Sequence, residues 1–149
     1  MKHFNGNPAV ILLVEDNEGD ARLAIEALKE GEISNDLHHV RDGVEAMEYL
    51  KHEGGYNQEN APKPDIILLD LNMPRMDGRE VLEEINRHPE LASIPIIVLT
   101  TSESEIDISK SYKLNANCYI SKPVDFDRFA KVIQMVEHFW FSIVSLPEN

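Results

Sequence analysis

The stretch "IILLDLNMPRMDGREV" (residues 66–81) decides the fold. Its aliphatic residues run directly into one acid, Asp70, and a proline and a glycine follow in the next turn of the chain. A continuous aliphatic run is typical of a strand that is covered on both faces, as in a parallel sheet. A carboxylate at the end of such a strand therefore needs a chemical explanation. The proline and glycine in the loop that follows it need one as well.

Two kinds of segment alternate along the rest of the chain. Strand patterns occur over 9–14, 36–42, 65–70, 95–100 and 117–121. Apolar residues at helical spacing predict helices over 18–30, 43–52, 78–88, 103–114 and 125–143, the last with Asp125 as its N-cap. This alternation predicts an α/β fold with a doubly wound, five-stranded parallel sheet, right-handed crossovers and five helices. In such sheets, function collects at the carboxyl ends of the strands.

The length of 149 residues suits one domain with a sizeable core. We expect a single domain over 1–149, with its core over about 9–143. Two regions lie outside the alternating pattern. One is a polar extension over 52–64, rich in Gly, Asn and Pro, and the other is a C-terminal tail over 144–149.

The charge and cysteine content restrict the kinds of partner. A net charge of −13 repels phosphate backbones and anionic lipid, so we expect no direct binding to nucleic acid or membranes. The acidic balance suits a cation or a basic partner, although solubility alone explains most of the acids. A single cysteine, Cys118, excludes an internal disulfide, and we interpret it as a small buried hydrophobe. With no apolar run near the roughly 20 residues of a membrane span and no signal-peptide pattern, we expect a cytoplasmic protein.

Polar residues follow the predicted strands at one common edge of the sheet. They are Glu15 and Asp16, Asp70, Thr100 and Lys122. Carboxylates packed together repel one another, and a divalent cation relieves the repulsion. All-oxygen ligation left incomplete by the protein is the Mg²⁺ pattern. Lys and Thr side chains then suit the oxygens of a phosphoryl group, and one carboxylate suits the role of nucleophile in an acyl phosphate.

The loop after Asp70 fits this chemistry. The main-chain carbonyl of Asn72 lies close enough in sequence to reach the same metal. Pro74 fixes one φ angle, and Gly78, where the third predicted helix starts, can adopt backbone angles that other residues avoid. No one of these pieces is specific alone, and the inference depends on four strand ends in this order.

The motifs "LLVEDN", "LLDLNMPRMDG", "VLTTS" and "CYISKP" together resemble the receiver domain of two-component response regulators, over about Val10 to Trp140. The resemblance implies a flavodoxin-like strand order, 2-1-3-4-5. It also implies phosphoryl transfer from a sensor histidine kinase to a phosphoacceptor aspartate in the presence of Mg²⁺. By position in the motifs, the matching residues are Asp70 as phosphoacceptor, Glu15, Asp16, Asp70 and the carbonyl of Asn72 as metal ligands, Thr100 and Lys122 as phosphoryl contacts, Thr100 and Tyr119 as switch residues, and Lys122–Pro123 as a cis peptide.

The long 52–64 connection and the ending "EHFWFSIVSLPEN" resemble the small response regulators that pair with cyanobacterial and bacterial phytochromes. This narrower resemblance implies a phytochrome-type kinase as partner. The cluster Phe139, Trp140 and Phe141 covers more than one face of its predicted helix, which favours a homodimer through the last helix and tail over an overpacked core edge.

Several alternatives stay open on the residues alone. Tyr119 suits half-buried packing as well as a switch role. The six histidines, among them His38 and His39 in alternation across one strand, are interpreted as structural or solvent-facing. A Mg²⁺-dependent phosphohydrolase with an aspartyl nucleophile is the alternative function. A third possibility, an inert scaffold with a receiver-like fold, fails because every expected site residue is present in the sequence. The phosphohydrolase pattern resembling haloacid dehalogenases needs a second acid two residues after the nucleophile, where this chain has Asn72.

Overall fold

The computed structural model describes residues 8–29, 35–71, 76, 78–100 and 118–121, and for the end of the fourth strand and all of the fifth it describes the backbone path. Five strands form one parallel sheet in the order β2-β1-β3-β4-β5. They are β1 (Ala9–Val14), β2 (Asn35–Val40), β3 (Ile66–Asp70), β4 (Ile96–Thr100) and β5 (Cys118–Ser121). The doubly wound flavodoxin-like fold predicted from the sequence is confirmed.

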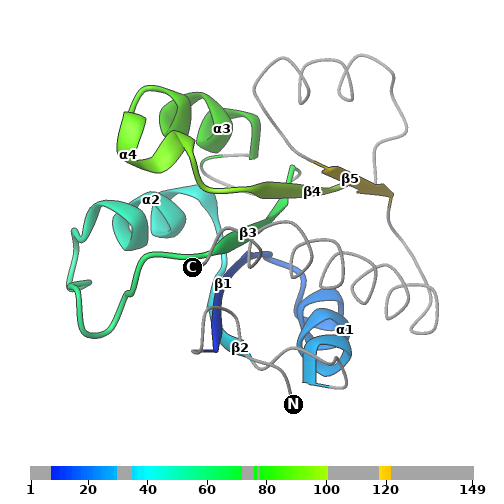
Figure 1. Cartoon of the computed structure of the whole chain (residues 1–149). Coiled ribbons are helices and arrows are strands. Elements are labelled where there is room, and N and C mark those ends of the chain that lie inside the picture. Colours follow the sequence, from blue (N-terminus) through cyan, green and yellow to red (C-terminus); the bar gives the residue numbers. More distant parts are fainter. Residues whose placement is uncertain (1–7, 30–34, 72–75, 77, 101–117, 122–149) are drawn as a thin grey trace, which may run out of the picture.

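Helices cover both faces of this sheet (Figure 1). The helix α1 (Glu18–Lys29) lies on one face, and α2 (Gly43–Lys51) and α3 (Gly78–Asn86) lie on the other. A short helix, α4 (Pro89–Ala92), follows α3 directly. The helices predicted over 103–114 and 125–143 lie outside the described residues.

Alternation along the buried strands divides the core into two clusters. Leu12 and Val14 of β1 face α2 and α3, whereas Ile11 and Leu13 face α1. The strand β3 is divided in the same way, and all its residues are buried. Burial of both faces explains why β1, β3 and β4 are almost uniformly aliphatic in the sequence.

The boundaries of β2 differ from the prediction of 36–42. The strand ends at Val40 because Asp42 is the N-cap of α2, with its Oδ1 accepting a hydrogen bond of 2.9 Å from the Glu45 amide. The amide of Arg41, the residue before this N-cap, also donates to Glu45 Oε1 at 2.9 Å. Capping therefore takes these residues out of the sheet.

The 52–64 extension is a folded loop on the outer side of α2. The Tyr49 hydroxyl donates to the Pro62 carbonyl at 2.7 Å, and the Tyr56 hydroxyl donates to Glu45 Oε2 at 2.8 Å. The rings of Tyr49 and Tyr56 lie 5.4 Å apart. Ala61 is fully buried, and its carbonyl oxygen lies 2.8 Å from His52 Nε2. Although the extension is polar in composition, these contacts anchor it as an ordered loop.

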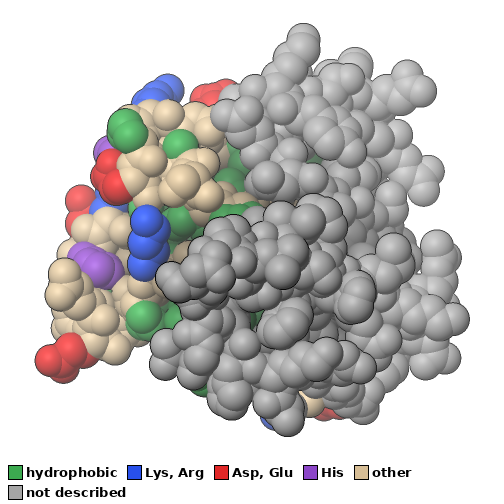
Figure 2. All heavy atoms as spheres, in the orientation of Figure 1, with side chains coloured by type: hydrophobic (Ala, Val, Ile, Leu, Met, Phe, Trp, Pro, Cys, Tyr) green, Lys and Arg blue, Asp and Glu red, His purple; other side chains and the backbone are tan. Residues whose placement is uncertain are grey.

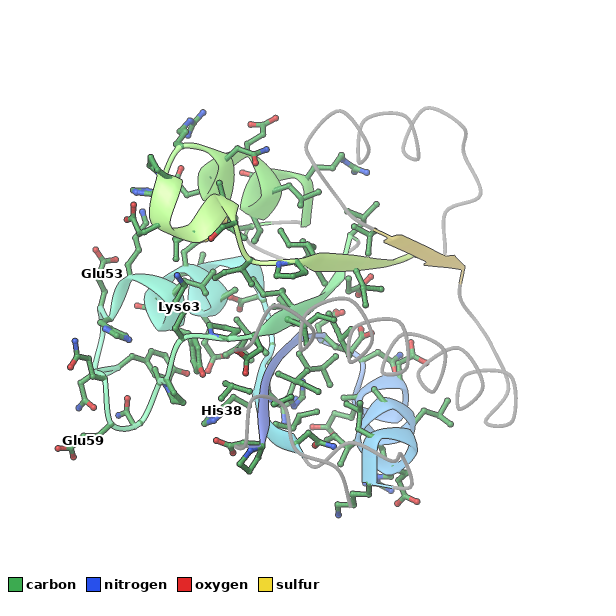
Figure 3. The ribbon with its side chains drawn as sticks, viewed as in Figure 1. His38, Glu53, Glu59 and Lys63 are labelled. Atoms are coloured by element: carbon green, nitrogen blue, oxygen red, sulfur yellow. The ribbon has the colours of Figure 1, made fainter. Side chains whose placement is uncertain are left out.

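The outer surface of this loop is charged. Glu53 and Glu59 point away from the sheet (Figure 3). On the coloured part of the face in Figure 2, acidic, basic and histidine side chains lie interspersed. Among the residues that the figure colours, positive and negative charges are therefore mixed on this surface.

Candidate functional site

The first acidic pair lies in the turn between β1 and α1. The Glu15 amide continues the sheet by donating to the Val40 carbonyl at 3.0 Å. Asn17 then caps α1, because its Oδ1 accepts from the Asp20 amide at 2.9 Å. The Asn17 amide donates in turn to Glu15 Oε2 at 3.2 Å. Strand and helix thus fix the two ends of a turn that contains Glu15, Asp16 and Asn17.

Asp70 occupies the last position of β3, next to β1 in the sheet. The residue is 3% exposed. Immediately behind it, the Gly78 amide at the start of α3 donates to the Leu71 carbonyl at 3.0 Å. A β-carbon on Gly78 would overlap the Asp70 carbonyl oxygen and lie 2.7 Å from Leu71 Cα. Only glycine lets α3 begin this close to the end of β3.

A second glycine, at the start of α2, packs against Met76. The Gly43 amide donates to the Met76 carbonyl at 3.0 Å, and a β-carbon on Gly43 would overlap that same carbonyl. Leu71 is therefore held against the first turn of α3, and Met76 against the first turn of α2. This explains why the stretch 66–81 has a glycine at residue 78. Close packing against the end of β3 requires glycine at this position, which is also the first residue of α3.

Adjacent strand ends bring the three acids together. Carboxylate oxygens of Glu15, Asp16 and Asp70 all lie within 4.8 Å of one another. Glu15 is 1% exposed and Asp70 is 3% exposed, and Asp16 is the more open of the three. Charges of one sign at this separation and burial repel strongly unless a cation or protons compensate. An all-oxygen set open on one side has the chemistry that a hard divalent cation requires, so these residues fit such an ion.

The backbone also places two further predicted residues on the neighbouring strands β4 and β5. Thr100 ends β4, one position beyond the pair Asp70–Leu99, and it pairs with Ser121 of β5. Tyr119 lies inside β5, paired with Val98. Thr100 thus lies at the carboxyl edge that the sequence predicts for it, whereas Tyr119 lies further back along the neighbouring strand. The other predicted site and interface residues lie outside the described part of the chain: Asn72, Lys122, Pro123, Phe139, Trp140 and Phe141.

Sequence reasoning did not single out one contact at this site. His39 Nε2 lies 2.7 Å from the main-chain oxygen of Glu15. The prediction that the histidines are structural or solvent-facing covers His39 only in general terms. The alternation of His38 and His39 places them on opposite faces of β2, but nothing in the sequence identifies the carbonyl that His39 contacts.

Comparison with known proteins fits this geometry. The sequence matches the response regulator receiver domain family over residues 11–134. The chain belongs to this family. It is 49% identical over 147 residues to the response regulator Rcp1 of Synechocystis sp. (strain ATCC 27184 / PCC 6803 / Kazusa), covering 99% of both chains. It is 38% identical over 135 residues to a probable methanogenesis regulatory protein, FilR2, of Methanothrix harundinacea (strain 6Ac), covering 90% of this chain and 84% of that protein.

Solved receiver structures share the fold of this receiver domain. A crystal structure of the Mn²⁺-bound form of Rcp1 superposes with a TM-score of 0.82 at 48% identity, covering 91% of this chain and 96% of the other. A crystal structure of the phosphorylated cyanobacterial phytochrome response regulator RcpA gives a TM-score of 0.83 at 49% identity, covering 91% and 95%. This receiver domain is thus related to phytochrome response regulators. Among its described helices, none has the length and apolar character needed to cross a bilayer.

Proposed function

We propose that this receiver domain is a single-domain response regulator that accepts a phosphoryl group on Asp70 in a Mg²⁺-dependent reaction. The observation that carries the proposal is the cluster of Glu15, Asp16 and Asp70 carboxylates within 4.8 Å at the carboxyl ends of β1 and β3. Mg²⁺ bound there would neutralise negative charge beside the incoming phosphoryl group. The Mn²⁺-bound form of the relative Rcp1 supports a divalent ion in this role.

The proposed reaction is a direct transfer. An oxygen of the Asp70 carboxylate forms the new bond to phosphorus, and the phosphorus–nitrogen bond of the donor phosphohistidine breaks. The imidazole of the donor leaves with the electron pair. Asp70 suits this role because β3 is buried along its length and aims the carboxylate from a rigid element. Glu15, Asp16 and the carbonyl of Asn72 are the proposed further metal ligands, and Thr100 and Lys122 the proposed phosphoryl contacts.

We further infer that the donor is a sensor histidine kinase of the phytochrome type. Support comes from the identity to the phytochrome response regulator RcpA over most of both chains. The proposed switch residues are Thr100 and Tyr119. Separately, we propose that the Lys122–Pro123 bond is a cis peptide. We also propose that Phe139, Trp140 and Phe141 form a homodimer contact. The chain is proposed to form one domain over 1–149. Membership of a signalling family favours this function over the phosphohydrolase alternative.

Phosphorylation by a small donor tests the proposal. The protein is incubated with acetyl phosphate and Mg²⁺, and intact mass is recorded with and without excess chelator. We expect a gain of one phosphoryl group that chelator abolishes and that is lost in Asp70→Asn. Asp65→Asn is the matched control, because Asp65 precedes the opposite end of the same strand, and it should gain the group normally. A gain that survives in Asp70→Asn would contradict the assignment.

A further inference from the structure

His39 makes a contact that the proposed chemistry does not use directly. Its Nε2 lies 2.7 Å from the main-chain oxygen of Glu15. A carbonyl oxygen can only accept, so Nε2 carries the proton and donates it. The imidazole lines a cleft between α1 and β2, together with Arg22, Ile25 and Arg41. The ring is therefore partly exposed, and side chains of similar size can replace it without overpacking.

The accepting carbonyl belongs to the peptide group that joins Glu15 to Asp16. The paired register of β1 with β2 ends at Val14 and Val40, so Glu15 lies just beyond the ladder. Its amide donates to the Val40 carbonyl at 3.0 Å, and its carbonyl receives His39. Both polar main-chain groups of Glu15 are thus bound to β2. The orientation of this peptide sets the directions in which the two carboxylates leave the chain.

The neighbouring His38 makes no comparable contact. It lies on the opposite side of β2 from α1 (Figure 3), where its Nε2 is 3.1 Å from Asp36 Oδ2. Its ring is 5.6 Å from the ring of Tyr49. The strand therefore carries two adjacent histidines of opposite orientation, of which one contacts the acidic turn and the other contacts the α2 side.

We propose that His39 is a positioning residue for the divalent cation. By donating to the Glu15 carbonyl, it holds the Glu15–Asp16 peptide in the orientation that keeps both carboxylates within reach of Asp70. Partners that orient metal ligands contribute to affinity without touching the metal. This inference rests on the proposed function, because it concerns the same acidic site.

Direct metal binding tests the inference without any phosphotransfer readout. The probe is Mn²⁺ alone, titrated into the full chain and followed by the electron paramagnetic resonance signal of free Mn²⁺, with Mg²⁺ as competitor. The variants are His39→Leu, which removes the donor, and His39→Gln, whose side-chain amide can donate at the place of Nε2. His38→Gln is the matched control. Urea unfolding in metal-free buffer records the stability of each variant.

We expect His39→Leu to weaken Mn²⁺ binding about 10-fold, while His39→Gln and His38→Gln stay within about 3-fold of wild type, a spread of less than 1 kcal/mol. Equal affinity in wild type and His39→Leu overturns the inference, whatever happens to stability. Failure of His39→Gln to restore affinity, with its stability intact, also overturns it. If wild type itself binds no Mn²⁺, the proposed metal site fails, and the inference fails with it.

Discussion

Gly78 lies against Asp70 so closely that a β-carbon at residue 78 would overlap the Asp70 carbonyl oxygen. The first turn of α3 is thus in contact with the main chain of the proposed phosphoacceptor. The Gly78 amide also donates to the Leu71 carbonyl at 3.0 Å, which fixes the residue directly after Asp70. Any side chain at residue 78 must therefore displace either α3 or the end of β3.

Gly78→Ala should lower the free energy of unfolding by about 1–3 kcal/mol, the usual cost of forcing an extra carbon into a packed site. Urea denaturation followed by circular dichroism measures it. Gly19→Ala in the first turn of α1 is the control. Its β-carbon would approach only the Asn17 side chain, at 3.3 Å, so we expect a change within about 1 kcal/mol. Equal effects of the two substitutions would contradict the packing argument.

Tyr49→Phe should release the far end of the 52–64 loop. Tyr49 is 1% exposed, and its hydroxyl donates to the Pro62 carbonyl at 2.7 Å. Removing the hydroxyl leaves that carbonyl without this donor, at a cost of about 1–2 kcal/mol. The measurement is urea unfolding combined with amide hydrogen exchange across 52–64. Faster exchange confined to this loop is expected, and unchanged exchange there would show that the hydroxyl does not anchor it.

Glu84 should make the free energy of unfolding depend on pH. Hydrogen bonds from Lys51 at 2.9 Å and from Arg87 at 2.8 Å lower the pKa of Glu84 from 4.5 to about 2. A lowered acid pKa contributes stability above the unfolded value and loses it as pH falls through the folded value. Wild type should therefore be more stable than Glu84→Gln at neutral pH, and the difference should shrink between pH 4.5 and about 2.

Thermal unfolding across that pH range tests the Glu84 prediction. The control is Glu83→Gln, because Glu83 is an exposed residue of the same helix. A stability difference between wild type and Glu84→Gln that stays constant down to pH 2 would exclude the charged contacts as its cause. Because the Glu84 side chain is 23% exposed, added salt should also reduce the difference.

Asp65 should show the opposite dependence. Burial raises its pKa above 3.8, and the hydrogen bond from the Val10 amide at 2.8 Å offsets only part of this effect. A raised acid pKa means that stability is lost as pH rises through the folded value. Asp65→Asn keeps an oxygen for the Val10 amide and should be more stable than wild type at neutral pH. The advantage should vanish below pH 3.8 in chemical denaturation, and an advantage of the same size at low pH would contradict this cause.

The sheet was predictable because its signal is strong and local. Strands covered on both faces must be aliphatic throughout, so β1, β3 and β4 stand out in the sequence, and their polar ends mark one edge. The convergence of Glu15, Asp16 and Asp70 follows from parallel pairing alone, and the structure confirms it. The roles of these residues stay predictions.

Features set by single side-chain contacts were not predictable. The sequence pattern extended β2 to residue 42, whereas capping by Asp42 ends the strand earlier. The pattern predicts a third helix that extends to residue 88, whereas α3 ends at Asn86. A second helix, α4, then begins at Pro89, a residue suited to a first helical turn. The contact of His39 with Glu15 joins residues 24 positions apart. Periodicity carries no information on such contacts, because it records which face a residue occupies and not which atom it reaches.

The exposed turn at 57–60 divides the acidic set between two stretches of chain, with Glu15 and Asp16 before it and Asp70 after it. A chain cut in this turn would yield two fragments, each holding part of the ligand set. Neither fragment alone could gather three carboxylates, because adjacent β1 and β3 lie on opposite sides of the cut. Cation uptake would then report fragment complementation, so this fold offers a split reporter whose signal requires the central strand pair to reassemble.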